Sequence, residues 1–177
     1  MRETFVIRKV KSEDAREYVE LQNLIWRDAY SHIFPEEVFV DRESNYDKRI
    51  KWIENFKNDD KQIGYVAVVN DKIVGLMNAV ISSDYEYFKN KGYSELMILY
   101  IHPDYQGVGI GSSFKKIFVD WAIRNGSTKF VIGVLADNVK ARKVYEKWGG
   151  KLDDYTQPFV KLGVCYKEVF YTYDLKV

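Results

Sequence analysis

Apolar and polar residues alternate along the chain with two different periods, which predict where strands and helices lie. Residues 4–10 alternate as a strand does. From residue 12 to about residue 30, apolar side chains keep helical spacing, and Ser12 followed by two acids is a favourable helix start. Pro35 can open a further helical stretch, and residues 47–56 form a shorter helical pattern. The first third of the chain therefore predicts one strand followed by helices.

The middle of the chain predicts a β-hairpin and a buried strand. Two apolar runs within residues 62–82 flank Asn70 and Asp71, which tolerate the positive φ of a tight turn. A polar and aromatic insertion at residues 83–93 then precedes an almost wholly apolar run at 95–101. Such a run is typical of a strand that is buried on both faces.

The remaining segments complete a mixed pattern: a helix at 111–126, a strand at 129–135, a helix at 138–150 and a long strand at 163–175. The order β-α-α-β-β-β-α-β-α-β-β predicts an α/β protein (mixed α+β) with a mixed sheet and helices on its faces. The chain contains no repeat, low-complexity tract or linker. We therefore expect a single domain across residues 1–177.

Composition narrows the range of partners. The chain has 177 residues and a formal net charge of +1, with acids and bases interspersed, so we expect no nucleic-acid or membrane partner. No apolar run approaches the ~20 residues that span a bilayer, and residues 1–10 lack a signal-peptide core. The single cysteine, Cys165, excludes an internal disulfide, and we expect it to be a small buried residue. These features together predict a cytoplasmic protein.

Three alternating glycines, Gly107, Gly109 and Gly111, stand between the buried strand and the next helix. Glycine lets a ligand approach the backbone, and free amides at a helix N-terminus attract anions. The plainer interpretation is a tight turn that binds nothing. Two common phosphate motifs do not fit, because Ser112 stands where the dinucleotide fingerprint needs glycine, and no Gly-Lys-Ser/Thr follows.

The stretch YIHPDYQGVGIG resembles the acyl-CoA signature of the GNAT family of N-acetyltransferases, Q/R-x-x-G-x-G/A, with Gln106, Gly109 and Gly111 at its defined positions. Downstream, the residues from Asn138 to Gly149 resemble the second family motif, N-x-x-A-x-x-x-Y-E-K-x-G. The motifs occur in the family's order, with one helix and one strand between them. The resemblance covers nearly the whole chain and implies a GNAT-type acyltransferase fold: a twisted mixed sheet of seven strands, helices on both faces, and splayed fourth and fifth strands.

The resemblance also implies acetyl-CoA as the co-substrate, with no metal. Backbone amides of the glycine turn would hold the pyrophosphate, and the end of the fourth strand would pair with the pantetheine arm. The thioester would lie where the fourth and fifth strands part. The residues implied to bind acetyl-CoA are Leu99, Tyr100, Ile101, Gln106, Gly107, Val108, Gly109, Ile110, Gly111, Ser112 and Asn138.

Acetyl transfer to an amine needs a neutral amine, hydrogen-bond donors for the oxyanion and a proton for the departing thiolate. Tyr145 is the expected proton donor, because it shares one helix face with Asn138 and the small Ala141. The family motif places it beside the thioester sulfur. The plainer interpretations are that Tyr145 is a core tyrosine with a satisfied hydroxyl and that Asn138 is a helix N-cap.

The base is less well marked. Many GNAT members carry a glutamate on the fifth strand where this chain has Gly133. We expect Glu95 to replace it by acting through a water molecule, with its pKa raised by partial burial. The alternative is that Glu95 is a solvated acid at a strand end. His32 is a second candidate base.

The resemblance identifies the donor and leaves the acceptor open, because function belongs to the site rather than to the fold. We expect a primary amine of a small molecule that attacks the acetyl group directly in a ternary complex. Protein N-terminal or lysine acetylation, and a non-catalytic acyl-CoA sensor, are the alternatives. Within the insertion, Tyr85, Tyr87 and Phe88 can stack on a cationic amine, although a solvated loop is the plainer interpretation. The aromatic C-terminal strand suggests pairing with a second chain as a homodimer.

Overall fold

Seven strands form one mixed sheet in the computed structural model of the chain, which describes residues 4–175. Their order across the sheet is β1-β2-β3-β4-β5-β7-β6, and every neighbouring pair is antiparallel except β4 and β5. The sheet confirms the fold predicted from the sequence. The strands are β1 (Val6–Lys9), β2 (Gln62–Val69), β3 (Lys72–Val80), β4 (Ser94–Ile101), β5 (Lys129–Leu135), β6 (Lys151–Lys161) and β7 (Val164–Asp174).

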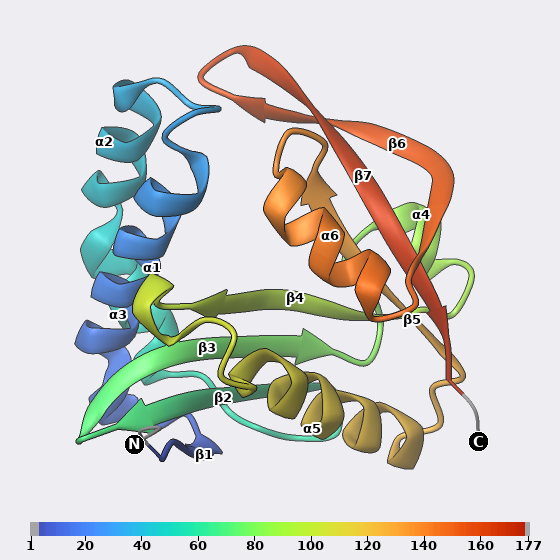
Figure 1. Ribbon diagram of the computed structural model, residues 1–177, viewed down its shortest axis with the longest axis horizontal. Coiled ribbons are helices and arrows are strands. Elements are labelled where there is room, and N and C mark those ends of the chain that lie inside the picture. The colour runs from blue at the N-terminus through green and yellow to red at the C-terminus, as the bar shows by residue number, and fades with distance from the viewer. Residues whose placement is uncertain (1–3, 176–177) are drawn as a thin grey trace.

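Helices flank both faces of the sheet (Figure 1). Phe114 and Phe118 of α5 pack against one face, and Tyr18 of α1 and Ile53 of α3 pack against the other. None of the described helices is long and apolar enough to cross a membrane. The helices are η1 (Ser12–Asp14), α1 (Ala15–Tyr30), α2 (Glu36–Ser44), α3 (Tyr46–Glu54), α4 (Glu86–Lys89), η2 (Pro103–Tyr105), α5 (Ile110–Arg124) and α6 (Val139–Lys147).

Strands β4 and β5 part soon after they meet. Only Ser94 and Glu95 of β4 pair with β5, opposite Phe130 and Val131. Beyond these residues β5 continues its ladder with β7, and β4 continues with β3. The two strands diverge in Figure 1, where β4 runs to the left and β5 rises behind α6. The predicted splay is therefore present, and it leaves one edge of β4 unpaired.

Several local predictions can be compared with the structure. Asn70 and Asp71 both have positive φ, as the predicted hairpin turn requires. Three helices rather than two separate β1 from β2, because α2 ends at Ser44 and α3 begins at Tyr46. Cys165 is exposed rather than buried, since it lies beside the turn that joins β6 to β7.

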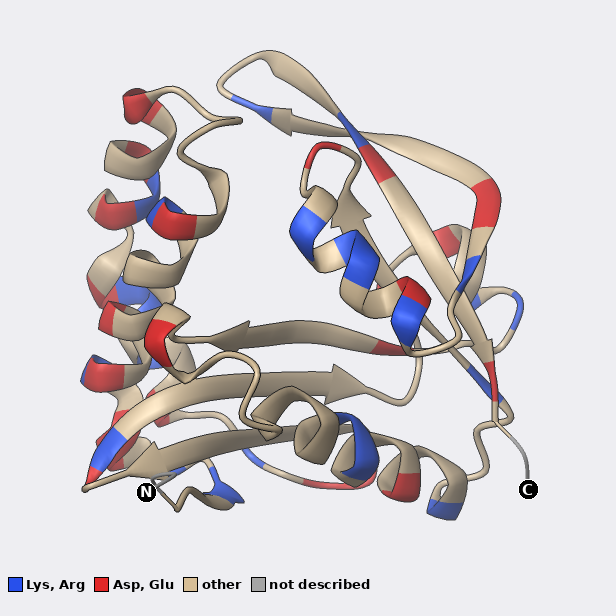
Figure 2. Cartoon of the chain, in the orientation of Figure 1, with Lys and Arg blue, Asp and Glu red and all other residues tan. Residues whose placement is uncertain are grey.

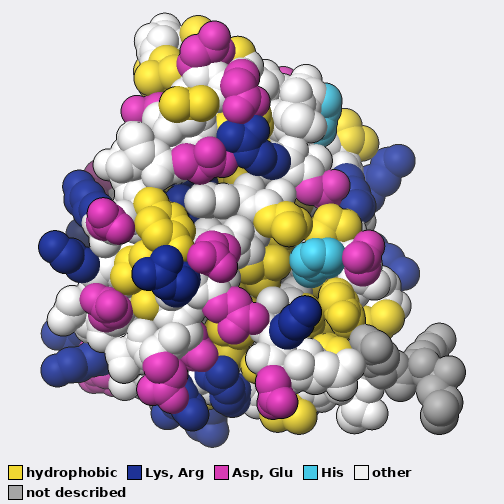
Figure 3. Space-filling view, turned by 90° about the vertical axis from the view of Figure 1, so that its left-hand side faces the viewer, with side chains coloured by type: hydrophobic (Ala, Val, Ile, Leu, Met, Phe, Trp, Pro, Cys, Tyr) yellow, Lys and Arg dark blue, Asp and Glu magenta, His cyan; other side chains and the backbone are white. Residues whose placement is uncertain are grey.

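The surface over α1, α2 and α3 mixes acidic and basic side chains (Figure 3). Arg27 is an example, since it forms ion pairs with Glu36 at 2.9 Å and with Glu43 at 2.7 Å.

The C-terminal strand differs from its expected role. β7 pairs with β5 over residues 168–174 and with β6 on its other side, so where these two ladders overlap both of its edges are occupied. β6, not β7, is the outer strand at that side of the sheet.

Candidate active site

A cavity of about 890 Å³ opens where β4 and β5 part. Three groups of elements form its walls. β4 and the glycine turn lie on one side of the splay, β5 and α6 lie on the other, and the end of α1 forms the third wall. The predicted site residues among its lining residues are Leu99, Tyr100, Ile101, Gln106, Gly107, Gly109, Gly111, Ser112, Asn138 and Tyr145. The fold therefore brings the two sequence motifs to one cavity.

The glycine turn presents free backbone amides to this cavity. Gly107 and Gly109 have φ of 77° and 102°, and a Cβ on either would meet no atom within 4 Å. Ser113 is the first residue whose amide bonds back, to the Gly109 carbonyl at 3.0 Å. Among residues 4–175, no carbonyl accepts from the amides of residues 109–112. These amides lie at the start of α5, so the turn fits a phosphate group.

Gln106 fixes the turn to the end of β4. Its side-chain Nε2 donates to the Ile101 carbonyl at 3.0 Å. The motif glutamine therefore has a structural role here, which holds the turn against the unpaired strand edge. The side chain also lines the cavity.

Helix α6 forms the opposite wall. Asn138 Oδ1 accepts from the Ala141 amide at 3.1 Å, so Asn138 is the N-cap of α6, and it also lines the cavity. Lys140 and Lys147 line the cavity as well, and Figure 2 shows basic positions along the surface of α6. Sequence analysis missed these two lysines, although their seven-residue spacing on a helix places them on one face.

Tyr145 is buried, with 8% of its surface exposed, and it lines the cavity from α6. Its backbone carbonyl accepts from the Tyr173 hydroxyl at 2.8 Å, which ties α6 to β7. Burial is the main cause that raises the pKa of the Tyr145 hydroxyl, and the nearby Tyr100 adds to it. The hydroxyl therefore keeps its proton across the physiological range of pH.

Glu95 is buried at the point where β4 leaves β5, with 4% of its surface exposed. Its Oε2 accepts from the Ser83 hydroxyl at 2.7 Å and from the Asp84 amide at 2.9 Å. Burial raises the pKa of Glu95, as the sequence analysis expected. The carboxylate holds the start of the insertion and is not among the residues that line the cavity.

A second buried acid, Glu168 of β7, lies beside Gly133. Its Oε1 accepts from the Tyr85 hydroxyl at 2.7 Å, and its Oε2 accepts from Gln157 Nε2 at 2.8 Å. Gly133 lines the cavity, and a Cβ there would stand 2.5 Å from the Tyr85 hydroxyl oxygen. The space that a side chain at position 133 would occupy is therefore filled by Tyr85 and Glu168, which come from two distant segments of the chain. Sequence analysis missed Glu168. The one feature that could have revealed it is that an acidic residue stands within a largely apolar strand.

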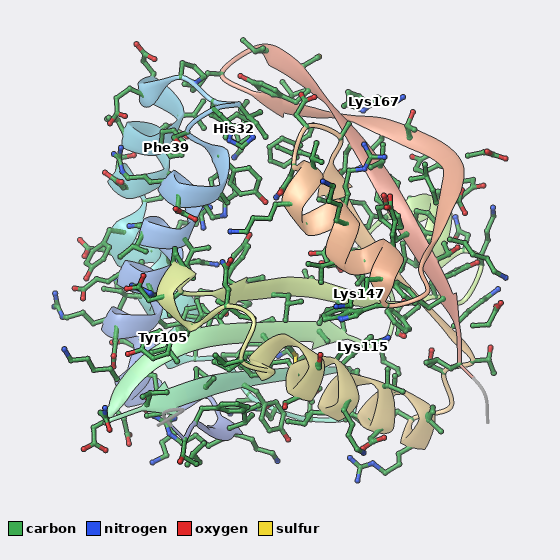
Figure 4. The ribbon with its side chains drawn as sticks, viewed as in Figure 1. His32, Phe39, Tyr105, Lys115, Lys147 and Lys167 are labelled. Atoms are coloured by element: carbon green, nitrogen blue, oxygen red, sulfur yellow. The ribbon has the colours of Figure 1, made fainter. Side chains whose placement is uncertain are left out.

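An aromatic cluster lies beside the cavity at the end of α1. Tyr30 and His32 line the cavity, and Figure 4 shows His32 in the loop that follows α1. In the same loop, Phe34 packs edge-on against Tyr166 and stacks on Phe159, with ring centroids 4.7 Å and 6.2 Å apart. These contacts join the α1–α2 loop to the β6–β7 hairpin, in one cluster with Tyr30 and Tyr100 of the cavity lining.

Comparisons with known proteins agree with this geometry. The family model described as the acetyltransferase (GNAT) family matches residues 18–150. The L-methionine sulfoximine/L-methionine sulfone acetyltransferase of Salmonella typhimurium is 24% identical over 112 residues, 63% of this chain and 63% of that protein. The N-acetylaspartate synthetase of Danio rerio is 28% identical over 98 residues, 53% of this chain and 33% of that protein. The matches thus span less than two thirds of either curated relative.

A solved structure matches a larger part of the chain than these two proteins do. The yncA protein of Salmonella typhimurium, solved with its cofactor acetyl-CoA, has a TM-score of 0.71 and 22% identity. The match covers 97% of this chain and 94% of that chain, and at this identity it shows the fold alone. The family model spans both motifs and most of the cavity walls. The chain belongs to the acetyltransferase (GNAT) family.

Proposed function

We propose that the chain transfers the acetyl group of acetyl-CoA to a primary amine of a small molecule, with both substrates bound together. One observation carries this proposal: a single cavity extends from the glycine turn to the aromatic end near Tyr30. A continuous space lets the amine attack without a covalent enzyme intermediate. The names of the two curated relatives support the choice of acceptor, because both refer to amino-acid compounds.

The residues present fit acetyl-CoA. The open space above Gly107 and Gly109 admits a phosphate to the free amides, and Lys140 and Lys147 add positive charge. The unpaired edge of β4 at residues 99–101 offers backbone groups to an extended chain, as a missing strand would. Asn138 lies at the other side of the gap. When bound, acetyl-CoA supplies an acetyl thioester that a neutral amine can attack.

Two side chains are proposed to move protons. Tyr145 keeps its hydroxyl proton and lines the cavity, so it is the proposed donor to the leaving sulfur. Glu95 is the proposed base, and a water molecule connects it to the amine because its own side chain does not line the cavity. The substitution Glu95→Gln should lower kcat/KM by ~10²-fold and remove the acidic limb of its pH profile. An unchanged profile would exclude Glu95 as the base.

An aromatic cluster beside the cavity favours a small acceptor over a protein. Phe34, Phe159 and Tyr166 pack together in this cluster, which also contains Tyr30 of the cavity lining. Turnover of acetyl-CoA should be measured as released thiol with spermidine, the L-amino acids, an aminoglycoside and short peptides. Turnover with a free amine supports the proposal. Turnover with peptides alone would indicate a protein acceptor, and acetyl-CoA binding without turnover would indicate a sensor.

A homodimer remains a prediction. Because β6 rather than β7 is the outer strand, we expect the dimer to form through β6. β6 is an outer strand of the sheet, and Leu152 and Val160 along it are exposed. An exposed strand edge can pair with a second copy. Light scattering of the purified chain measures the mass directly, and a monomer at every concentration would exclude the dimer.

A further inference from the structure

Tyr85 is held at both ends by buried acids. Its backbone amide donates to the Ser83 hydroxyl oxygen at 3.1 Å, and that hydroxyl donates to Glu95. Its own hydroxyl donates to Glu168 Oε1 at 2.7 Å. The ring packs edge-on against Phe170, with centroids 4.8 Å apart. The tyrosine is therefore fixed in place without any ligand.

This fixed hydroxyl lies against Gly133 of β5, and Tyr85 itself is not among the residues that line the cavity. Gly133 lines the cavity, and a Cβ on it would stand 2.5 Å from the Tyr85 oxygen and 3.1 Å from Glu168 Oε1. Tyr100, which also lines the cavity, is an electrostatic neighbour of the same hydroxyl. The side chain keeps part of its surface exposed. Glycine at 133 thus lets this hydroxyl approach the gap between β4 and β5.

The hydroxyl can only accept a further hydrogen bond. A tyrosine hydroxyl has one proton to donate, and Tyr85 gives it to Glu168. Burial and the neighbouring acids raise the pKa of Tyr85, so its hydroxyl keeps the proton that it donates to Glu168. No lysine or arginine of residues 4–175 forms a salt bridge with Glu95 or Glu168. The surroundings therefore favour a positively charged group that donates N–H.

We propose that the Tyr85 hydroxyl oxygen accepts a hydrogen bond from the acceptor amine, and that Glu168 positions this hydroxyl. Tyr85 is then a specificity-determining residue of the acceptor site, and Glu168 acts through it. The inference rests on the proposed function, because it assumes an amine acceptor. It also assigns a role to the insertion at residues 83–93, which places the Tyr85 hydroxyl against Gly133. Proton removal by Glu95 through water is compatible with this arrangement.

The test compares Tyr85→Phe, Glu168→Gln, their double variant and the control Tyr93→Phe with the wild type. Tyr93 lies in the same insertion and the same aromatic cluster, and unlike Tyr85 it is not among the side chains nearest to Gly133. The acceptor is whichever amine of the panel above turns over fastest. The readouts are KM for that amine, KM for acetyl-CoA, kcat and the melting temperature.

Loss of the hydroxyl in Tyr85→Phe should raise KM for the amine by about ten-fold to a hundred-fold, the usual cost of a lost hydrogen bond to a charged group. KM for acetyl-CoA and the melting temperature should match those of Tyr93→Phe. Glu168→Gln should act in the same direction, and the double variant should be no worse than Tyr85→Phe alone, because both changes remove one interaction.

An amine KM in Tyr85→Phe equal to that of Tyr93→Phe, with an active wild type, would overturn the inference and leave the proposed function standing. Equal losses for both substrates together with a lower melting temperature would also overturn it, since they would indicate a structural role. A wild type that acetylates no amine in the panel would overturn the proposed function and this inference together.

Discussion

The two halves of the cavity are built from different groups of the protein, one mainly from backbone groups and the other from side chains. The half proposed to bind acetyl-CoA, the donor half, presents mainly backbone: the amides of the glycine turn and the unpaired edge of β4. The half proposed to bind the amine, the acceptor half, is bordered at Gly133 by side chains from distant segments, Tyr85 and Glu168, which are 83 residues apart in the sequence. The donor half contains no buried acid, whereas Glu95 and Glu168 are both buried beside the acceptor half.

This difference explains how one fold can keep its donor while its acceptor changes. A backbone site needs only the glycines that allow its conformation, so most side chains around it are free to vary. A side-chain site depends on each residue that supplies a group, and a single substitution alters what it binds. We therefore expect substitutions in the donor half to change KM for acetyl-CoA, and substitutions in the acceptor half to change KM for the amine.

Tyr145→Phe should give the largest effect, because Tyr145 lines the cavity and is the proposed proton donor to the leaving sulfur. The loss of the proton donor should lower kcat by ~10²-fold or more and leave KM for acetyl-CoA unchanged. Tyr65→Phe is the matched control, since Tyr65 packs against the same core cluster without lining the cavity. Steady-state kinetics with both substrates measure the effect. An unchanged kcat would show that another group protonates the leaving thiolate.

Gly109→Ala should give the next largest effect and should be confined to the donor. Ala at a φ of 102° is strained, and its methyl group would enter the open space in front of the free amides. We expect KM for acetyl-CoA to rise by about ten-fold, equivalent to ~1.4 kcal/mol. Gly126→Ala is the control, because Gly126 also has positive φ and open space but lies at the other end of α5. Equal kinetics in both variants would contradict a phosphate site at the turn.

The same contrast explains how much of the site could be predicted from the sequence. Gln106, Gly109 and Asn138 belong to short motifs, and their geometry depends on neighbours a few residues away. Periodicity likewise predicted the hairpin at Asn70 and the apolar β4 strand. These features are local, so a single sequence contains the information for them.

The acceptor half could not be predicted in the same way. The contact of Tyr85 with Glu168 depends on β5 pairing with β7, and no local pattern sets that pairing. The sequence analysis found Gly133 to lack a carboxylate, but could not show that Tyr85 and Glu168 fill its space. Burial also depends on tertiary packing, which is why Cys165 was expected inside and lies outside.

The smallest expected effect concerns stability, and it tests whether the acceptor half carries a cost that the donor half lacks. Burial raises the pKa of Glu95 in the folded protein above its value in the unfolded chain. Between these two pKa values the folded protein binds more protons than the unfolded chain. The stability contribution of Glu95 is therefore complete below the unfolded pKa and is lost as pH rises through the folded pKa.

Glu95→Gln cannot ionise, and its amide oxygen can still accept from Ser83 and Asp84. The variant should be more stable than the wild type at pH 7.5, by about 1 kcal/mol or less, and the gain should vanish near pH 4. Urea unfolding at both pH values measures the difference, and Glu37→Gln on α2 controls for the loss of an exposed acid. A variant that is less stable than the wild type at pH 7.5 but not near pH 4 would show that ionised Glu95 stabilises the fold. The acceptor half would then hold its buried acids without a cost in stability, and the contrast with the donor half would rest on binding alone.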